Sequence, residues 1–480
     1  MTLSARIDDF EAYARQVLDR YLCPGLAVGL AQKGELTYFK GFGFRNVEHQ
    51  LPMTPDTVMG IGSCTKSFTC VAVMQLQEAG RLSVHDPVVR YLPEFRLPDQ
   101  AHARAVTLHH LMTHTAGLPP LPTLLHAMVR SMKADPALKV GSALDGVKPI
   151  QTVEEMMDLI AATRFELLGP PGTRFSYSND GFALLGAVVE RVSGMPLARY
   201  IKEQILLPAG MTRTTLVTAD LESLTDVALL YSTRRGEDGE PEVGPAPGWW
   251  EISPMEAAGH MRSTVGDMLR YCELYRTGGL VGGARILQPE SVRAMTTPYF
   301  EYLPGLFYGY GLQIVPDYHG LSLIEHGGAI KGVSAQFSVM PGRQLTGVAL
   351  TNLAGVPSAD ILLSAMNAAA GLPLEARRTE PAPYDCPPAE LARYEGEFPT
   401  TEGVPGVFSV RVEEGALVAR SAGGLEPMPP VTLIPAGPHR FYYRTKDSTT
   451  HVRFHFGSDG KVWAVSIGLR MLRKNVTFCD

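Results

Sequence analysis

The chain has 480 residues, of which 45% are hydrophobic and 19% are charged, a composition typical of globular proteins and not of disordered ones. This length suits one large domain and a smaller second one. The net charge of −6 argues against nucleic acid as a partner, because phosphates require a basic surface. No apolar run approaches the ~20 residues that cross a bilayer, so we also predict no membrane partner.

The N-terminus predicts an amphipathic helix and not a secretory signal. Ile7, Phe10, Ala14 and Val17 recur at helical spacing, with acidic and basic residues between them. A signal would begin with a basic end and a continuous apolar stretch. The six cysteines are scattered and include no C-x-x-C pair. We therefore expect a cytoplasmic protein with reduced thiols.

Strand and helix signals up to residue 375 predict a mixed fold. Two strand-like runs, at 26–32 and 35–40, are joined by a Lys-Gly turn. Helical periodicity covers 67–79 and 181–192, and each stretch ends near a glycine. Four more strand candidates and a closing helix come last, at 311–315, 321–325, 333–340, 345–353 and 359–370. This order predicts an α+β domain whose sheet joins both of its ends.

Other stretches carry different patterns. Residues 121–148 have weak periodicity and are interpreted as an insertion, and the Gly/Pro-rich stretch 231–250 as a surface loop. The stretch 376–388 is a Pro-rich linker. Beyond it, short runs rich in Val, Phe, Tyr and Trp predict a small antiparallel sheet or barrel. We therefore divide the chain into a domain over 1–375, the linker, and a β domain over 389–480.

A first chemical motif lies where a loop leads into the helix predicted at 67–79. Ser63 and Lys66 form an S-x-x-K, and this spacing places both side chains on one helix face. Serine is a weak nucleophile until a base takes its proton, and burial lowers the affinity of a lysine for its own proton. The helix start adds backbone N–H donors where oxyanion charge develops. Alone, an S-x-x-K occurs by chance in many chains.

Two more motifs follow along the chain. Tyr177 and Asn179 form a Y-x-N, which offers a phenol for acid–base chemistry and an amide that can hold a substrate amide. His326-Gly327-Gly328 ends a predicted strand, and its glycines let another backbone approach closely. Each has an ordinary structural explanation, a buried tyrosine beside a turn asparagine in one case and a simple Gly-Gly turn in the other. The three motifs in one order carry more weight than each alone.

In this order the motifs resemble those of the serine β-lactamase and penicillin-binding-protein superfamily, which includes class C β-lactamases, D-aminopeptidases and CubicO-type esterases. The segments 41–43 (GFG) and 111–118 (LMTHTAGL) also match this family, and the resemblance covers roughly residues 5–370. It implies an antiparallel sheet flanked by helices, with a helical subdomain. Some relatives carry a lipocalin-like domain where this chain has its small all-β C-terminal segment. The family needs no cofactor and no metal.

The resemblance also implies catalytic roles. Ser63 is the nucleophile that forms the acyl-enzyme, and Lys66 is its partner base. Tyr177 protonates the leaving group and then helps a water attack the acyl-enzyme. The backbone N–H of Ser63 contributes to the oxyanion hole.

The binding residues follow in the same way. Ala329 supplies the second oxyanion N–H, Asn179 holds the substrate amide, and His326, Gly327 and Gly328 line the substrate. True β-lactamases usually have lysine where this chain has His326. Because free imidazole titrates near 6.5, His326 offers no fixed charge for a substrate carboxylate, which places β-lactamase activity in doubt. Histidine here is more typical of the D-aminopeptidase and esterase relatives.

Other basic residues near the motifs receive structural interpretations. Lys331 is close enough in sequence to replace the missing charge, but we interpret it as solvated. His109, His110 and His114 are spaced for one helix face, yet no carboxylate or cysteine accompanies them at ligand spacing. We therefore predict no metal site.

These residues predict a metal-free hydrolase of small peptides or esters, of the D-aminopeptidase or carboxypeptidase kind. A carboxylesterase on the same site is the first alternative, because the acyl-enzyme chemistry is shared. A penicillin-binding or sensing protein that acylates without turnover is the second, and the presence of both Lys66 and Tyr177 argues against it. We expect the β domain to shape access to the Ser63 pocket or to support assembly of a homo-oligomer, an independent appendage being the alternative.

Overall fold

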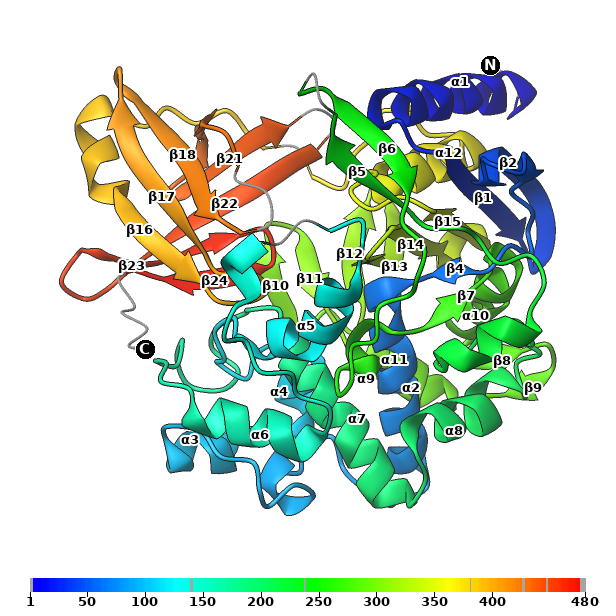
Figure 1. Cartoon of the computed structure of the whole chain (residues 1–480), viewed down its shortest axis with the longest axis horizontal. Helices are drawn as coiled ribbons and strands as arrows, with labels where there is room; N and C mark the ends of the chain where they lie inside the picture. Colours follow the sequence, from blue (N-terminus) through cyan, green and yellow to red (C-terminus); the bar gives the residue numbers. More distant parts are fainter. Residues whose placement is uncertain are drawn as a thin grey trace.

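A nine-stranded antiparallel sheet forms the centre of the larger domain (Figure 1). The computed structural model describes residues 3–138, 141–236, 239–379, 381–424, 428–445 and 448–474. In order across the sheet, the strands are β10 (Phe300–Leu303), β11 (Leu306–Tyr308), β12 (Gln313–Tyr318), β13 (Leu321–Ile330), β14 (Val333–Met340), β15 (Leu345–Thr351), β1 (Gly25–Gln32), β2 (Glu35–Asn46) and β3 (Leu51–Pro52). β15 pairs with β14 on one side and with β1 on the other, so the sheet joins both ends of the domain, as predicted.

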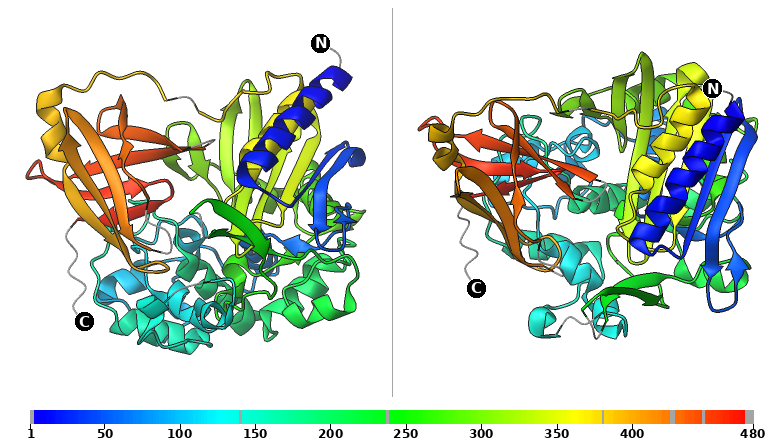
Figure 2. Two further views of the ribbon diagram at one scale, coloured as in Figure 1. Left: turned by 45° about the horizontal axis from the view of Figure 1, so that its top comes forward. Right: turned by 90° about the horizontal axis from the view of Figure 1, so that it is seen from above.

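Helices cover both faces of this sheet. α1 (Leu3–Tyr21) and α12 (Ser358–Ala370) lie side by side on one face (Figure 2). α10 (Val265–Thr277) packs on β1, β14 and β15 from the other face, and α2 (Thr65–Glu78) belongs to the same buried core. Because both faces are covered, β14 and β15 are buried along their whole length.

The remaining helices of this domain form a mainly helical region beside the sheet (Figure 1). They are α3 (Gln100–Ala105), α4 (Leu108–Met112), α5 (Thr123–Ala134), α6 (Val153–Ala162), α7 (Asn179–Ser193), α8 (Leu197–Ile201), α9 (Glu256–Gly259) and α11 (Pro289–Met295). Three two-stranded antiparallel sheets complete it: β4 (Met59–Gly60) with β7 (Arg262–Ser263), β5 (Tyr231–Arg235) with β6 (Pro241–Pro245), and β8 (Leu280–Val281) with β9 (Ala284–Arg285). Among the described residues, no single helix is long and apolar enough to cross a bilayer, and only the pair Asn179–Ser193 and Leu197–Leu206, bent by 76°, reaches that length and hydropathy together.

The stretch 121–148 is more ordered than its sequence suggests. It contains α5 and a 3₁₀ helix, Gly141–Leu144. Leu125, Val129 and Met132 recur every three or four residues and form a buried cluster with Leu144. The apolar face is narrow, which is why its periodicity is weak in the sequence.

The stretch 231–250 was interpreted as a loop, and this interpretation is wrong for its first part. β5 and β6 pair there as an antiparallel hairpin. The buried Tyr231 anchors it: its hydroxyl accepts a hydrogen bond from the backbone N–H of Val47 at 2.7 Å. Residues 237–238 at the tip lie outside the described part of the chain.

Two further antiparallel sheets lie beyond residue 388 (Figure 1). One contains β16 (Gly396–Thr400), β17 (Gly406–Glu413), β18 (Ala416–Gly423) and β19 (Val431–Thr432). The other contains β20 (Ile434–Gly437), β21 (Arg440–Thr445), β22 (Ser448–Phe456), β23 (Val462–Ile467) and β24 (Arg470–Arg473). Their inner faces share one core, built around Phe398, Phe408, Phe441 and Phe454. This core is separate from the two cores of the larger domain.

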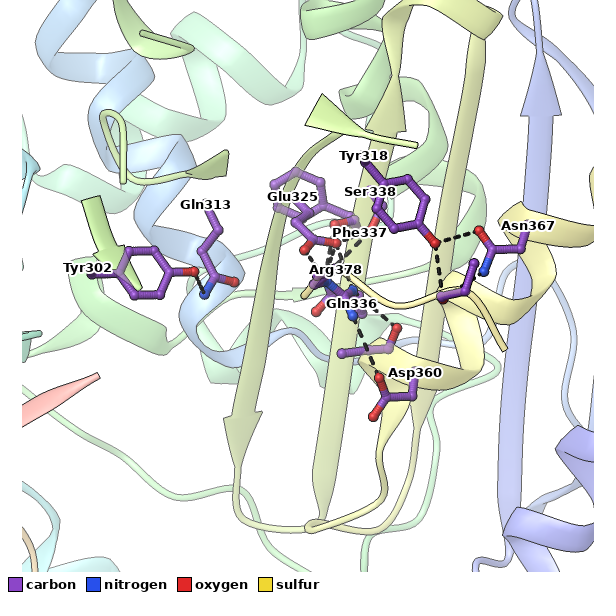
Figure 3. Close-up of polar contacts among 12 residues, drawn as sticks. Tyr302, Gln313, Tyr318, Glu325, Gln336, Phe337, Ser338, Asp360, Asn367 and Arg378 are labelled. Carbon is purple, nitrogen blue, oxygen red and sulfur yellow. Dashed lines mark hydrogen bonds and ion pairs between the residues drawn. The ribbon is translucent and has the colours of Figure 1, made fainter. Parts of the chain in front are cut away.

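A buried ion pair fixes the start of the linker to the sheet (Figure 3). The guanidinium of Arg378 binds the Glu325 carboxylate through Nε and Nη2, and only 3% of the Glu325 side chain is exposed. Gln336 and Ser338 on β14 also donate to Glu325, at 3.1 and 2.9 Å. Two of the polar residues that alternate along β14 therefore bind this one carboxylate. A second acid, Asp360 on α12, lies 3.6 Å from Arg378 Nη1.

We expect Arg378→Met to destabilise the protein by about 3 kcal/mol, because it leaves the buried Glu325 carboxylate without its countercharge. Chemical denaturation of the full chain measures this change. Arg377→Met is the matched control, since Arg377 is exposed and is expected to change stability by less than about 0.5 kcal/mol. Equal effects of both substitutions would contradict this assignment.

Candidate active site

Ser63 lies in a 3₁₀ turn, Gly62–Cys64, directly before α2. Gly62 has φ +48°, and a Cβ atom there would lie 2.5 Å from the backbone nitrogen of Ala329. A Cβ on Gly328 would lie 1.9 Å from the carbonyl oxygen of Ile61 and 3.0 Å from the nitrogen of Ser63. Only glycine fits at both positions. These two glycines therefore bring the backbone of the Ser63 turn against that of β13.

Lys66 is completely buried one turn along α2. Its Nζ lies 3.1 Å from Ser63 Oγ, 2.8 Å from Asn179 Oδ1 and 2.6 Å from the carbonyl oxygen of Ala258. Burial first, and then the positive charge of Arg470, hold the pKa of Lys66 well below its ordinary value. A neutral amine has two N–H donors for the two carbonyl oxygens and keeps its lone pair for the Ser63 proton. The surroundings of Lys66 suit a base.

The second motif lies at the start of α7. Ser178 is the N-cap, and its side chain accepts a hydrogen bond from the N–H of Gly181 at 3.1 Å. This cap fixes Asn179 in the first turn, where its amide oxygen faces Lys66. Tyr177 precedes the cap, and its ring centroid lies 4.7 Å from Lys66 Nζ. Burial raises the pKa of Tyr177, against the opposing effect of the nearby Ser63 side chain, so the phenol stays protonated at neutral pH.

The third motif lies on an open strand edge. β13 pairs with β12 only as far as Glu325, whereas it pairs with β14 as far as Ile330. The backbone edge of β13 from His326 to Ala329 is therefore not paired with β12. The Ser63 turn packs against this edge, which is otherwise available to a ligand. The structure thus brings Ser63, Lys66, Tyr177, Asn179, His326, Gly327, Gly328 and Ala329 into one site.

The imidazole of His326 is buried behind Tyr308 and does not face solvent. Burial, and then the nearby Lys66, lower its pKa to about 3, so it is neutral, in keeping with the absence of a fixed charge predicted for this motif. His114 completes a chain of hydrogen bonds: the N–H of Ser178 donates to His114 Nδ1 at 3.0 Å, and Tyr308 Oη lies 3.2 Å from His114 Nε2 and 2.9 Å from His326 Nε2. His114 then carries its proton on Nε2, and Tyr308 donates to His326.

Sequence reasoning missed His114 and Tyr308 as site residues. His114 lies in the LMTHTAGL segment, which resembles the family. Its spacing from His109 and His110 fits one helix face, and nothing in this spacing indicates a contact with the site. Those two have separate structural tasks: His109 Nδ1 lies 2.8 Å from Tyr310 Oη, and His110 closes a capping box at α4. Within the described residues, no three His, Cys, Asp or Glu side chains lie close enough to hold a metal ion.

The interpretation of Lys331 as solvated is wrong. Its Nζ lies 2.6 Å from a carboxylate oxygen of Asp135, and the two side chains are only 6% and 3% exposed. The indole N–H of Trp250 donates to the same carboxylate at 2.8 Å. Lys331 is therefore paired with the end of α5 and offers no spare charge to a substrate.

Two residues from beyond the linker reach the site, and sequence reasoning missed both. Glu402, in the turn after β16, accepts a hydrogen bond from Asn179 Nδ2 at 2.7 Å. Arg470, the first residue of β24, binds Glu402 through Nε at 2.5 Å and Nη2 at 3.0 Å. Its guanidinium also lies 4.4 Å from the Tyr177 ring centroid. No motif spacing links these residues to positions 63 and 179.

This arrangement, a serine at a helix start beside a buried lysine, a tyrosine and an open strand edge, is of the kind that serine-dependent acyl transfer requires. The Beta-lactamase family model matches residues 10–370. The chain therefore belongs to the β-lactamase family, a superfamily of serine hydrolases that also includes penicillin-binding proteins, esterases and D-aminopeptidases.

Relatives with different names share this family. The chain is 32% identical over 308 residues to Protein Rv1367c of Mycobacterium tuberculosis, covering 61% of this chain and 72% of that one. It is 32% identical over 243 residues to Esterase EstB of Burkholderia gladioli (50% and 56% covered) and 26% identical over 363 residues to the D-aminopeptidase of Brucella anthropi (75% and 62% covered). The structure of the octameric penicillin-binding protein homologue from Pyrococcus abyssi matches with a TM-score of 0.68 at 28% identity, covering 97% of this chain and all of that one.

We expect Lys66→Ala and Tyr177→Phe each to reduce kcat by about 10²–10⁴, the usual contribution of a proton-transferring side chain. Activity of the unmodified protein should fall as the pH falls through the lowered pKa of Lys66, because the protonated amine cannot accept the Ser63 proton. The measurement is the pH dependence of kcat on a small activated ester, with thermal unfolding as the control for folding. A folded variant with near-normal kcat would remove that residue from the chemistry.

Proposed function

We propose that this protein is a serine hydrolase that cleaves small amides or esters through an acyl-enzyme on Ser63, as a peptidase of the D-aminopeptidase or carboxypeptidase kind. The observation that supports this best is the buried Lys66 amine, 3.1 Å from Ser63 Oγ and held by two carbonyl oxygens. In this scheme Lys66 takes the Ser63 proton as the hydroxyl attacks. The N–H groups of Ser63 and Ala329 bind the oxyanion that forms.

Tyr177 takes the second proton-transfer role. Its raised pKa keeps the hydroxyl protonated, which suits the donation of a proton to the leaving group. Its buried hydroxyl makes no hydrogen bond among the described residues, and the Ser63 side chain lies near it, where a leaving group would need a proton. In deacylation, the Tyr177 phenolate takes a proton from a water that attacks the acyl carbonyl; the bond from the acyl carbon to Ser63 Oγ breaks, and Ser63 regains its proton from Lys66. Turnover groups are thus present, which argues against a protein that only becomes acylated.

A carboxylesterase is the second candidate, because Esterase EstB is among the relatives at 32% identity. The same acyl-enzyme serves both reactions, and the two differ only in the leaving group. Steady-state assays with D- and L-amino acid p-nitroanilides and with short-chain p-nitrophenyl esters decide between them. The substrate class with the larger kcat/KM identifies the activity.

Assembly stays a prediction. The Pyrococcus abyssi homologue is described as octameric, which supports a homo-oligomer for this chain. Sedimentation velocity of the purified full chain measures its state, and a monomer at micromolar concentration would contradict it.

Treatment with a fluorophosphonate is expected to add one covalent group that maps to Ser63. Intact mass spectrometry and peptide mapping provide the measurement. Ser67→Ala is the matched control, since this buried serine donates to the carbonyl of Cys64 and lies on the same helix. Labelling of Ser63→Ala, or its turnover of substrate, would refute the proposed nucleophile.

Nitrocefin is expected to be a poor substrate, with kcat/KM at least about a hundredfold below that for the preferred ester or anilide. The physical reason is that His326 is neutral and Lys331 is paired with Asp135, so neither attracts the β-lactam carboxylate. Parallel assays on one protein preparation measure the ratio. Nitrocefin hydrolysis as fast as that of the preferred substrate would contradict this reasoning.

A further inference from the structure

The site contains an ion pair from the C-terminal sheets that the proposed chemistry does not use. Glu402 and Arg470 come from different parts of that region, the turn after β16 and the start of β24. Their side chains are 12% and 31% exposed, so forming the pair costs desolvation energy that a surface pair avoids. Because burial of this ion pair costs free energy and the pair acts on Lys66 and Tyr177, we expect it to contribute to the site.

We propose that Glu402 and Arg470 are positioning residues of the Ser63 site, which fix the amide of Asn179 and place one cation beside Lys66 and Tyr177. The C-terminal β region is thereby a working part of the catalytic centre. This inference rests on the proposed acyl-enzyme chemistry of Ser63. Glu402 and Arg470 act through Asn179, Lys66 and Tyr177 and take no proton themselves.

The orientation of the Asn179 amide depends on Glu402. Its oxygen accepts from Lys66 at 2.8 Å, and its nitrogen donates to Glu402 Oε1 at 2.7 Å. A flipped amide would turn its N–H₂ toward the Lys66 amine and its oxygen toward a carboxylate, and both contacts are unfavourable. Glu402 therefore selects the orientation in which Lys66 has an acceptor. Arg470 in turn holds Glu402 by two bonds.

The ion pair of Arg470 with Glu402 brings two charges to a centre whose other titratable groups are neutral. Seven titratable groups act on or contact the Lys66 amine: Cys64, Cys70, His114, Tyr177, His326, Glu402 and Arg470. Burial raises the pKa of the thiols and the phenol and lowers that of both imidazoles, so those five groups are neutral, whereas Glu402 and Arg470 form an ion pair. Asp180, with a pKa raised by burial to about 6, instead accepts from Thr123.

The two charges have opposite effects on Lys66. Arg470 lowers its pKa and Glu402 raises it, and Arg470 has the larger effect. Arg470 also opposes the rise in the pKa of Tyr177. The pair thus favours the neutral amine that Ser63 requires.

Backbone contacts make this placement specific. The N–H of Tyr177 donates to the carbonyl of Leu469 at 2.8 Å, and the N–H of Met471 donates to Ser176 Oγ at 3.3 Å. The segment before α7 and the start of β24 therefore run against each other on either side of Arg470. Thr401 Oγ1 donates to the carbonyl of Pro120 at 3.2 Å and anchors the turn that carries Glu402.

The test is an NMR titration of Lys66 in the full chain with ¹³C-labelled lysine, the resonance being assigned by its loss in Lys66→Arg. Arg470→Gln should raise the pKa of Lys66 by about one unit, and Glu402→Gln should lower it, because removal of each charge removes its effect on the amine. Arg470→Lys keeps the charge and should restore a value near that of the unmodified protein. This readout needs no turnover.

Arg473→Gln is the matched control for docking of the C-terminal sheets. Arg473 lies on the same strand and pairs with Glu166 of the larger domain, away from Ser63. It should leave the Lys66 titration unchanged. An unshifted Lys66 in both Arg470→Gln and Glu402→Gln, or an equal shift in Arg473→Gln, would overturn the inference.

Kinetics separate this inference from the proposed function. If the unmodified protein is labelled at Ser63, Arg470→Gln should move the acid limb of the labelling rate to higher pH and reduce that rate about tenfold or more at neutral pH, with recovery in Arg470→Lys. Absence of Ser63 labelling in the unmodified protein would refute the proposed function alone, because the Lys66 titration still decides whether Glu402 and Arg470 control its charge.

Discussion

The burial of the Lys66 amine is the constraint on which the rest of the site depends. An ammonium ion without solvent is costly, so the fold must either pair it or keep it neutral. Here two carbonyl oxygens, of Asn179 and Ala258, accept its hydrogens, and Ser63 Oγ lies at the remaining position. The cap at Ser178 and the glycine contacts at Gly62 serve this geometry, because each fixes one of the neighbours of the amine.

Around this amine the protein keeps the net charge close to zero. The chain from His114 through Tyr308 to His326 is made of neutral groups, and each hydrogen has one acceptor. The two formal charges, on Glu402 and Arg470, cancel each other. A centre of this kind responds strongly to one added or removed charge, because little water is present to screen it.

The sequence predicted the fold class and the local motifs well, because both depend on short spacings. S-x-x-K places its residues through one helix turn and Y-x-N through the N-cap of α7, and the structure brings Ser63, Lys66 and Asn179 into contact. Glu402 and Arg470 could not be found in this way, since only packing of the C-terminal sheets brings them near Asn179. The burial of Lys331 could not be predicted for the same reason. Its partner, Asp135, lies at the end of α5, in the stretch 121–148 that the sequence indicates as an insertion. Tertiary pairing of distant charges leaves no periodic trace in a sequence.

Arg470 lies in the last strand described, far along the chain from Ser63 and Lys66, and this separation has a consequence for synthesis. Domains fold from the N-terminus as the ribosome extends the chain by about 5–20 residues per second. Ser63 and Lys66 then emerge roughly 20–80 s before Arg470 does. During that interval Ser63 and Lys66 are part of the chain, but Glu402 and Arg470 are not yet both present. A chain that stops before residue 470 therefore has Ser63, Lys66 and Asn179 but lacks the ion pair whose members contact Asn179 and the Tyr177 ring.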